Sequence, residues 1–197
     1  LATLKANGLT EPERKAFLAS AERVAEWAKE RREKKAGASR PYPAEDVQLF
    51  APHVLMELDG LRSGIVLETN PWLQSTLELA LSSILTKVSR RQGDSTQGQQ
   101  EKRLAKGFPT RLFMKRCEEL SRQMAEYERL VPHGTPRALV EEADARARSP
   151  WPTVQVDLVV TSPPYPAVYD YVSHHADRLR WLGLRAEAAA RTYQVVS

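Results

Sequence analysis

The stretch "VQVDLVVTSPPY", residues 154–165, carries the clearest indication of fold. Its first seven residues are dense in β-branched and apolar side chains, which predicts a strand buried on both faces, as in a parallel sheet. Pro163 and Pro164 end that strand. The shorter run "RALVEEADARA", residues 137–147, predicts a second strand. An α/β layer is therefore expected from residue 137 onward.

The loop after Val160 has the chemistry of a binding site. In an open parallel sheet, ligands bind just beyond the carboxyl ends of the strands. The two prolines hold Ser162 and its neighbours extended, and they leave backbone carbonyls that have no proline N–H to pair with. A rigid row of hydrogen-bond acceptors next to the ring of Tyr165 suits a planar group that bears an amine, such as a nucleobase.

The segment Thr161-Ser162-Pro163-Pro164-Tyr165, followed by "DYVSHHADRLRWLGL" (170–184), resembles the catalytic motif of the S-adenosylmethionine-dependent amino-group DNA methyltransferases. The resemblance implies that the target base is flipped out of the duplex and stacks on Tyr165. Ser162 and the Pro163 carbonyl would then hold its exocyclic amine. Serine in the first position is similar to enzymes acting on N4 of cytosine, whereas Asp or Asn is more usual in those acting on N6 of adenine.

The resemblance also implies S-adenosylmethionine as cofactor, with Asp144 near its adenine; the alternative is a plain turn aspartate. The Gly-rich cofactor turn of the family is missing, since none of the nine glycines forms Gly-x-Gly. The first residue is Leu, so the chain is expected to be a fragment, inactive alone and binding the cofactor weakly. The expected fold is an incomplete Rossmann-like methyltransferase core, α/β, preceded by a large helical insertion and mostly helical by residue count.

Helical periodicity fills the first part of the chain. Thr10 to Glu13 begins a helix expected over 11–35 and stopped by Gly37, and Pro52 begins a short helix that Gly60 and Gly64 end. Asn70-Pro71 begins the central helix, which extends to Val88, and another covers 110–130. The helix-rich part is assigned to 1–136, with a basic loop at 89–107. The partial catalytic core with the SPPY loop is assigned to 137–197, with a helix after that loop.

Positive charge is concentrated in one segment. Between Lys87 and Arg116 there are nine basic and two acidic residues, which leaves 20 basic and 23 acidic of the totals of 29 and 25. This excess suits a polyanion, and Arg90, Arg91, Lys102 and Arg103 are predicted to contact DNA phosphates. The alternative is a solvated loop with a basic helix behind it.

Other features limit the function classes. Cys117 is the one cysteine, and it lies at helical spacing from apolar residues, so it is expected in the core. A single cysteine cannot supply a multi-cysteine metal site, and no metal site is predicted. The absence of a long apolar run or a leader predicts a cytoplasmic protein without membrane contact. DNA is the expected partner. The alternatives are a non-catalytic nucleic-acid-binding helical module, and a methyltransferase acting on RNA or on a protein amine.

Overall fold

The structure, a computed structural model, describes residues 2–91, 102–141, 143, 155, 157–161 and 171–184. In this part the chain is helical, with no strand. The helices are α1 (Ala2–Asn7), α2 (Glu11–Glu33), α3 (Ala44–Leu49), α4 (Pro52–Val66), α5 (Pro71–Val88), α6 (Phe108–Leu130) and α7 (Tyr171–Trp181). The expected predominance of helix is confirmed.

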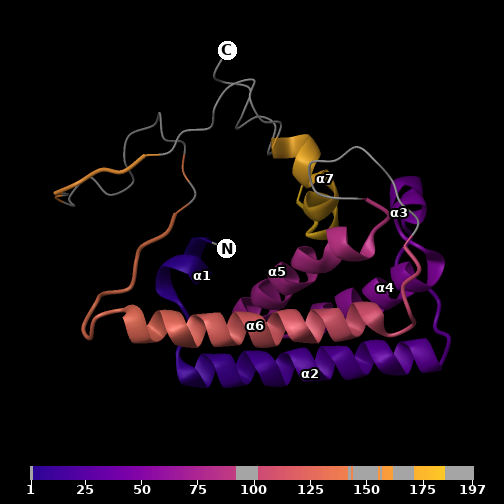
Figure 1. Cartoon of the computed structure of the whole chain (residues 1–197), viewed down its shortest axis with the longest axis horizontal. Helices are drawn as coiled ribbons and strands as arrows, with labels where there is room; N and C mark the ends of the chain where they lie inside the picture. Colours follow the sequence, from indigo (N-terminus) through magenta and orange to yellow (C-terminus); the bar gives the residue numbers. More distant parts are fainter. Residues whose placement is uncertain are drawn as a thin grey trace, which may run out of the picture.

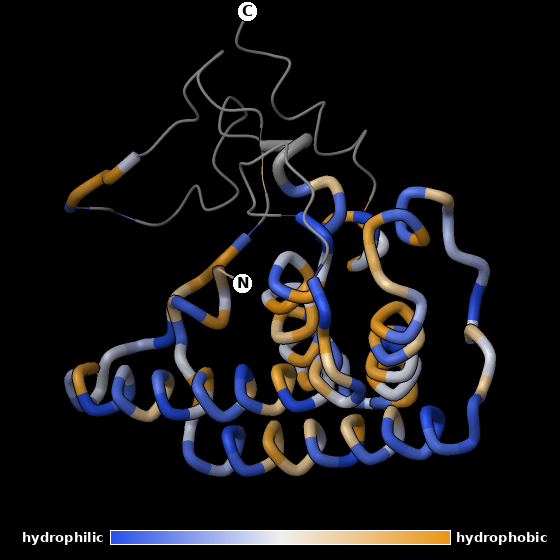
Figure 2. Tube along the Cα trace, turned by 45° about the vertical axis from the view of Figure 1, so that its right-hand side comes forward, coloured by the Kyte–Doolittle hydropathy of each residue, from blue (hydrophilic) through white to orange (hydrophobic). Residues whose placement is uncertain are grey.

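The long helices α2 and α6 lie side by side and run in opposite directions, with α4 and α5 packed behind them (Figure 1). Polar and apolar residues alternate around both helices, so each turns one side to the core (Figure 2). Near one end Arg14 of α2 pairs with Glu128 of α6. The core between the helices is built around fully buried side chains that include Phe17, Phe50, Leu58, Leu77 and Phe113.

Several helix ends follow the local signals in the sequence. The Thr10 amide donates to the Glu13 carboxylate at 2.8 Å, which is the capping-box contact expected before α2. Asn70 Oδ1 accepts the amides of Trp72 at 3.0 Å and Leu73 at 3.3 Å at the start of α5. The bounds of α2, α5 and α6 agree with the expected helices to within about two residues, which is the usual uncertainty of helix ends.

The expected end of α4 is wrong. Gly60 and Gly64 lie inside this helix, which continues to Val66. A Cβ atom on Gly60 would lie 3.1 Å from Cα of Ala28, and one on Gly64 would lie 3.0 Å from Cδ1 of Trp27. Both glycines therefore permit a close approach of α4 to α2, and neither terminates the helix.

Replacement of Gly60 with alanine is expected to destabilise the fold by about 1 kcal/mol. Alanine gains up to about 1 kcal/mol in helix propensity over glycine, but overpacking costs about 1–3 kcal/mol, and here the backbone of α2 would have to move. Urea denaturation measures the difference. Gly37→Ala is the control, since a Cβ there meets nothing within 4 Å. A Gly60→Ala variant more stable than the wild type would contradict the close packing.

The α/β layer is not seen in the described residues. Residues 137–141 and 157–161 form no strand. The Asn7 side chain makes both backbone hydrogen bonds of Ala138. Its Oδ1 accepts the Ala138 N–H at 2.6 Å, and its Nδ2 donates to the Ala138 carbonyl at 3.1 Å. Leu158, Val159 and Val160 are 75–86% exposed, and their segment lies away from the helices at the left of Figure 1. A buried strand needs neighbours on its edges and faces, and the described residues supply none.

The helix expected after the SPPY loop is present as α7, and it packs on the helices that precede it. Trp181, at its last position, is 4% exposed and belongs to the same core as α2, α4 and α5. The α7 helix contacts α5 and lies beside α3 (Figure 1). A division of the chain at residue 136 therefore places α7 in a different part from the helices on which it packs.

Candidate functional site

The predicted catalytic residues Ser162, Pro163, Pro164 and Tyr165 lie outside the described residues, as does Asp144. The structure does describe Thr161, which precedes the motif, and α7, which begins at Tyr171. The residues around α7 are therefore the described part of the candidate site.

Two of the predicted DNA-binding cations are bound to helix ends. The Arg90 guanidinium donates to the Gln48 carbonyl at 2.6 Å, near the end of α3. Lys102 Nζ donates to the carbonyls of Thr86 at 3.3 Å, in the last turn of α5, and of Arg91 at 2.6 Å. Positive charge is favourable at helix C-termini, where carbonyls lack partners. Partial burial lowers the pKa of Lys102.

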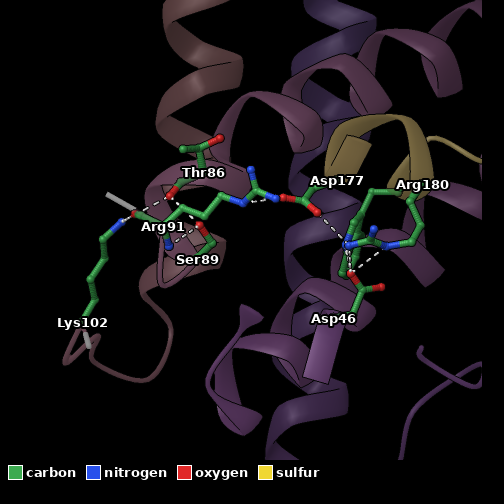
Figure 3. A network of polar contacts seen from close by, with 8 residues as sticks. Asp46, Thr86, Ser89, Arg91, Lys102, Asp177 and Arg180 are labelled. Atoms are coloured by element: carbon green, nitrogen blue, oxygen red, sulfur yellow. Dashed lines mark hydrogen bonds and ion pairs between the residues drawn. The ribbon is translucent and has the colours of Figure 1, made fainter. Parts of the chain in front are cut away.

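The third cation, Arg91, is joined to α7. Its Nε lies 2.9 Å from Oδ2 of Asp177, and the other oxygen of that carboxylate lies 2.8 Å from a terminal nitrogen of Arg180 (Figure 3). Arg180 donates in turn to Oδ1 of Asp46 at 2.7 and 3.1 Å. A continuous chain of alternating charges thus connects the basic segment, α7 and α3.

Asp46 is the buried end of this chain. It is fully buried in α3, and its Oδ1 accepts from Arg180 and also from Nε1 of Trp181 at 3.2 Å. Burial lowers the pKa of Arg180, but hydrogen bonds and attraction from Asp46 and Asp177 outweigh it, so that its pKa is raised. A buried carboxylate costs free energy unless it is paired, and Arg180 supplies that pairing.

The Trp181 ring completes the attachment of α7. It stacks on Tyr42 with ring centroids 5.6 Å apart, and it meets the edge of Phe50 at the same distance. The Arg40 guanidinium lies 4.9 Å from the Tyr42 centroid and 5.6 Å from that of Trp181. The end of α7 is therefore surrounded by aromatic and charged groups from the segment around residues 40–50.

A second buried acid, Asp59 of α4, holds that segment in place. Its carboxylate accepts the Ser39 hydroxyl at 2.6 Å, the Tyr42 hydroxyl at 2.7 Å and an Arg31 nitrogen at 3.0 Å. Burial, followed by the bond to Asp59, raises the pKa of Tyr42 to about 12. Tyr42 is therefore protonated at neutral pH and donates to Asp59. Reasoning from sequence did not single out Asp46 or Asp59, because neither belongs to a recognisable local motif.

A third buried acid caps α6. Glu57 of α4 is 2% exposed, and its Oε1 accepts the Gly107 amide at 2.5 Å. Its Oε2 lies 3.4 Å from the Thr110 hydroxyl and 3.6 Å from Arg32. Gly107 has φ of +79°, in the left-handed region that glycine adopts without strain. The start of α6 thus already has an anion, supplied by the protein itself.

Cys117 is buried in the core, as expected. Burial, followed by the nearby Glu118, raises the pKa of its thiol well above the usual range. The reactive form of cysteine is the thiolate, so this thiol is unreactive in the folded protein. These surroundings do not suit a catalytic nucleophile.

We predict that a thiol reagent labels native Cys117 more than about 100-fold more slowly than the unfolded chain, because labelling must wait for opening of the core. The measurement is the labelling rate by mass spectrometry, with and without denaturant. Native labelling as fast as in denaturant would show that Cys117 is accessible.

No group of three or more His, Cys, Asp or Glu side chains in the described ranges is arranged to hold a metal ion. Among the described helices, none combines the length and the apolar character needed to cross a membrane. In comparisons with known proteins, no family model, no curated protein and no solved structure matches the chain.

Proposed function

We propose that the chain is part of a DNA methyltransferase that modifies the exocyclic amine of a flipped base, N4 of cytosine in preference. The observation that carries this proposal is the sequence Thr161-Ser162-Pro163-Pro164-Tyr165 at the end of an apolar, β-branched run. Such a loop offers acceptors for an amine and an aromatic face for a base. The α/β methyltransferase core that the motif requires belongs to the same proposal.

In this proposal Tyr165 stacks on the base, while Ser162 and the Pro163 carbonyl accept the amine protons. These contacts orient the nitrogen lone pair, and catalysis comes mostly from positioning. S-adenosylmethionine is the proposed methyl donor. The described residues do not form a site for this donor. Gly60 and Gly64 permit the packing of α4 on α2, and the described residues contain no strand followed by a Gly-rich turn.

The contacts of α7 support the proposal. Five residues separate Tyr165 from Tyr171, where α7 begins. Arg91 of the basic segment bonds directly to Asp177 of α7. Two features that the sequence singled out separately, the basic segment and the motif, are thus linked through one helix.

The test is mass spectrometry of nucleosides from DNA incubated with S-adenosylmethionine and the whole protein. We expect N4-methylcytosine with the wild type and, with Tyr165→Ala, a yield lower by at least about 100-fold, because the flipped base loses its stacking partner. N6-methyladenine would move the assignment to adenine. No methylated base with folded protein and DNA of varied sequence would contradict the enzyme assignment.

A non-catalytic nucleic-acid-binding helical module is the second candidate, because the described part is helical and carries exposed cations. Binding and chemistry separate the two candidates. Under the enzyme assignment, Ser162→Ala abolishes methylation and leaves phosphate-driven binding intact. Under the binding assignment, the wild type binds DNA without methylating it.

A further inference from the structure

The nine basic residues between Lys87 and Arg116 fall into two groups in the structure. Four are held by the protein itself: Arg90, Arg91 and Lys102 as described above, and Arg116 by Glu119. The other five are exposed and have no polar partner among the described residues: Lys87, Arg103, Lys106, Arg111 and Lys115. The second group is free to meet an anion from outside.

Four of the free cations follow one another along the start of α6. Arg103 and Lys106 precede the helix, and Arg111 and Lys115 lie one turn apart on its exposed side. The nearest acids along the helix are Glu118, which is exposed, and Glu119, which is half-buried and paired with Arg116. The surface formed by Arg103, Lys106, Arg111 and Lys115 is hereafter the α6 cationic surface.

At the edge of this surface, the guanidinium group of Arg111 converges with that of Arg32 on α2. A Cβ atom on Gly107 would lie 3.0 Å from a terminal nitrogen of Arg111 and 3.2 Å from one of Arg32, so the two positive groups are close neighbours. The Arg32 nitrogen is buried and donates no hydrogen bond in the described part; its closest acid is Glu57, at 3.6 Å. The Glu57 carboxylate offsets part of this positive charge, whereas Arg111 has no acid partner in the described part, so its charge is available to an anion from outside.

A groove between α2 and α6 continues from this point. Its lining includes Lys29, Arg32 and Arg111, together with Glu22 and Glu26 further along α2. Glu26 is paired with Lys29 at 2.9 Å. The excess of positive charge therefore lies at the Gly107 end of the groove, next to the α6 cationic surface.

We propose that the α6 cationic surface, with Arg32 beside it, is where the protein contacts the phosphates of duplex DNA. This inference rests on the proposed DNA substrate. Charge complementarity selects a polyanion, and Arg111 and Lys115 are about 6 Å apart along α6. A DNA strand carries one phosphate per about 3.4 Å of duplex axis, so a separation of about 6 Å covers roughly two phosphate steps, and each side chain can meet a phosphate of the same strand.

The composition of this surface favours nucleic acid over a membrane. None of the large apolar side chains found exposed in the described part lies between residues 102 and 129. A helix that binds in a lipid interface needs such side chains beside its cations. Phosphate contacts from α6 also leave Arg91 in its pair with Asp177, where it holds α7.

The test measures the affinity for a duplex of about 20 base pairs as a function of salt, by fluorescence anisotropy with the whole protein. Lys106→Gln, Arg111→Gln and Lys115→Gln are combined in one variant. Each phosphate contact adds about 0.9 to the slope of log affinity against log salt, so we expect a slope smaller by about 3 and affinity at least about tenfold weaker near 0.1 M salt.

The control combines Lys5→Gln, Lys35→Gln and Arg129→Gln, three exposed cations elsewhere whose side chains also have no polar partner among the described residues and that change the net charge equally. We expect its slope to match the wild type. The proposal would be overturned if both variants lost the same affinity for DNA, or if the wild type did not bind DNA. It would also be overturned if the test variant lost affinity for single-stranded RNA or anionic vesicles but not for DNA. The DNA salt slope requires no methylation, so a reduced slope without any methylated base would refute the enzyme and leave the surface standing.

Discussion

Trp181→Ala is expected to destabilise the protein by about 3–5 kcal/mol, the usual cost of removing a buried tryptophan from a core. The ring is 4% exposed, stacks on Tyr42 and meets the edge of Phe50. Its Nε1 donates to Asp46 at 3.2 Å. The substitution leaves a cavity and removes one partner of a buried carboxylate, so both the core and the attachment of α7 are weakened.

The measurement is equilibrium urea denaturation, with Trp27→Ala as the matched control. Trp27 is 38% exposed and its Nε1 donates to Ser63 at 3.1 Å, so the same change there removes less buried surface. We expect the loss at Trp181 to exceed that at Trp27 by at least about 1 kcal/mol, the transfer free energy of the additional buried surface. Equal losses would mean that α7 does not depend on this contact.

Asp46→Ala is expected to cost about 3 kcal/mol. Breaking a fully buried ion pair costs about 3–5 kcal/mol, but the Arg180 side chain is 28% exposed, and water partly compensates its charge when Asp46 is removed. Trp181 Nε1 also loses its acceptor. Asp46→Asn keeps an acceptor oxygen without the charge, so a smaller loss is expected.

A double-mutant cycle with Arg180→Ala isolates the pair. Asp46 and Arg180 are in direct contact, so we expect a coupling free energy of about 1–2 kcal/mol by urea denaturation. Arg122→Ala with Glu126→Ala is the reference cycle, because that pair is exposed and a coupling of about 0.3–0.5 kcal/mol is usual. A coupling near zero for Asp46 and Arg180 would show that this ion pair does not stabilise the attachment of α7 to α3.

The helices were predictable wherever their signals are local. Asn70 before Pro71, and Thr10 before Glu13, form caps from side chains within three residues, and such contacts depend little on the rest of the fold. The α3 helix was missed because its segment, "AEDVQL", is short and lies next to a proline-rich loop. The roles of Gly60 and Gly64 were predicted wrongly, because a glycine in a sequence is compatible both with the end of a helix and with close packing of two helices. Only the position of α2 distinguishes the two.

The sequence by itself determined the helical character of the first part, the buried place of Cys117, the concentration of positive charge after Lys87 and the presence of the Ser-Pro-Pro-Tyr motif. Tertiary structure decided which cations are free. Arg91 is held by Asp177 and Lys102 by α5, whereas Arg111 and Lys115 face outward. Partners of this kind are distant in the chain, as with Arg180 and Asp46, which are 134 residues apart. Spacing patterns report only contacts within a few residues, so the pairing of charges across the fold follows from packing alone.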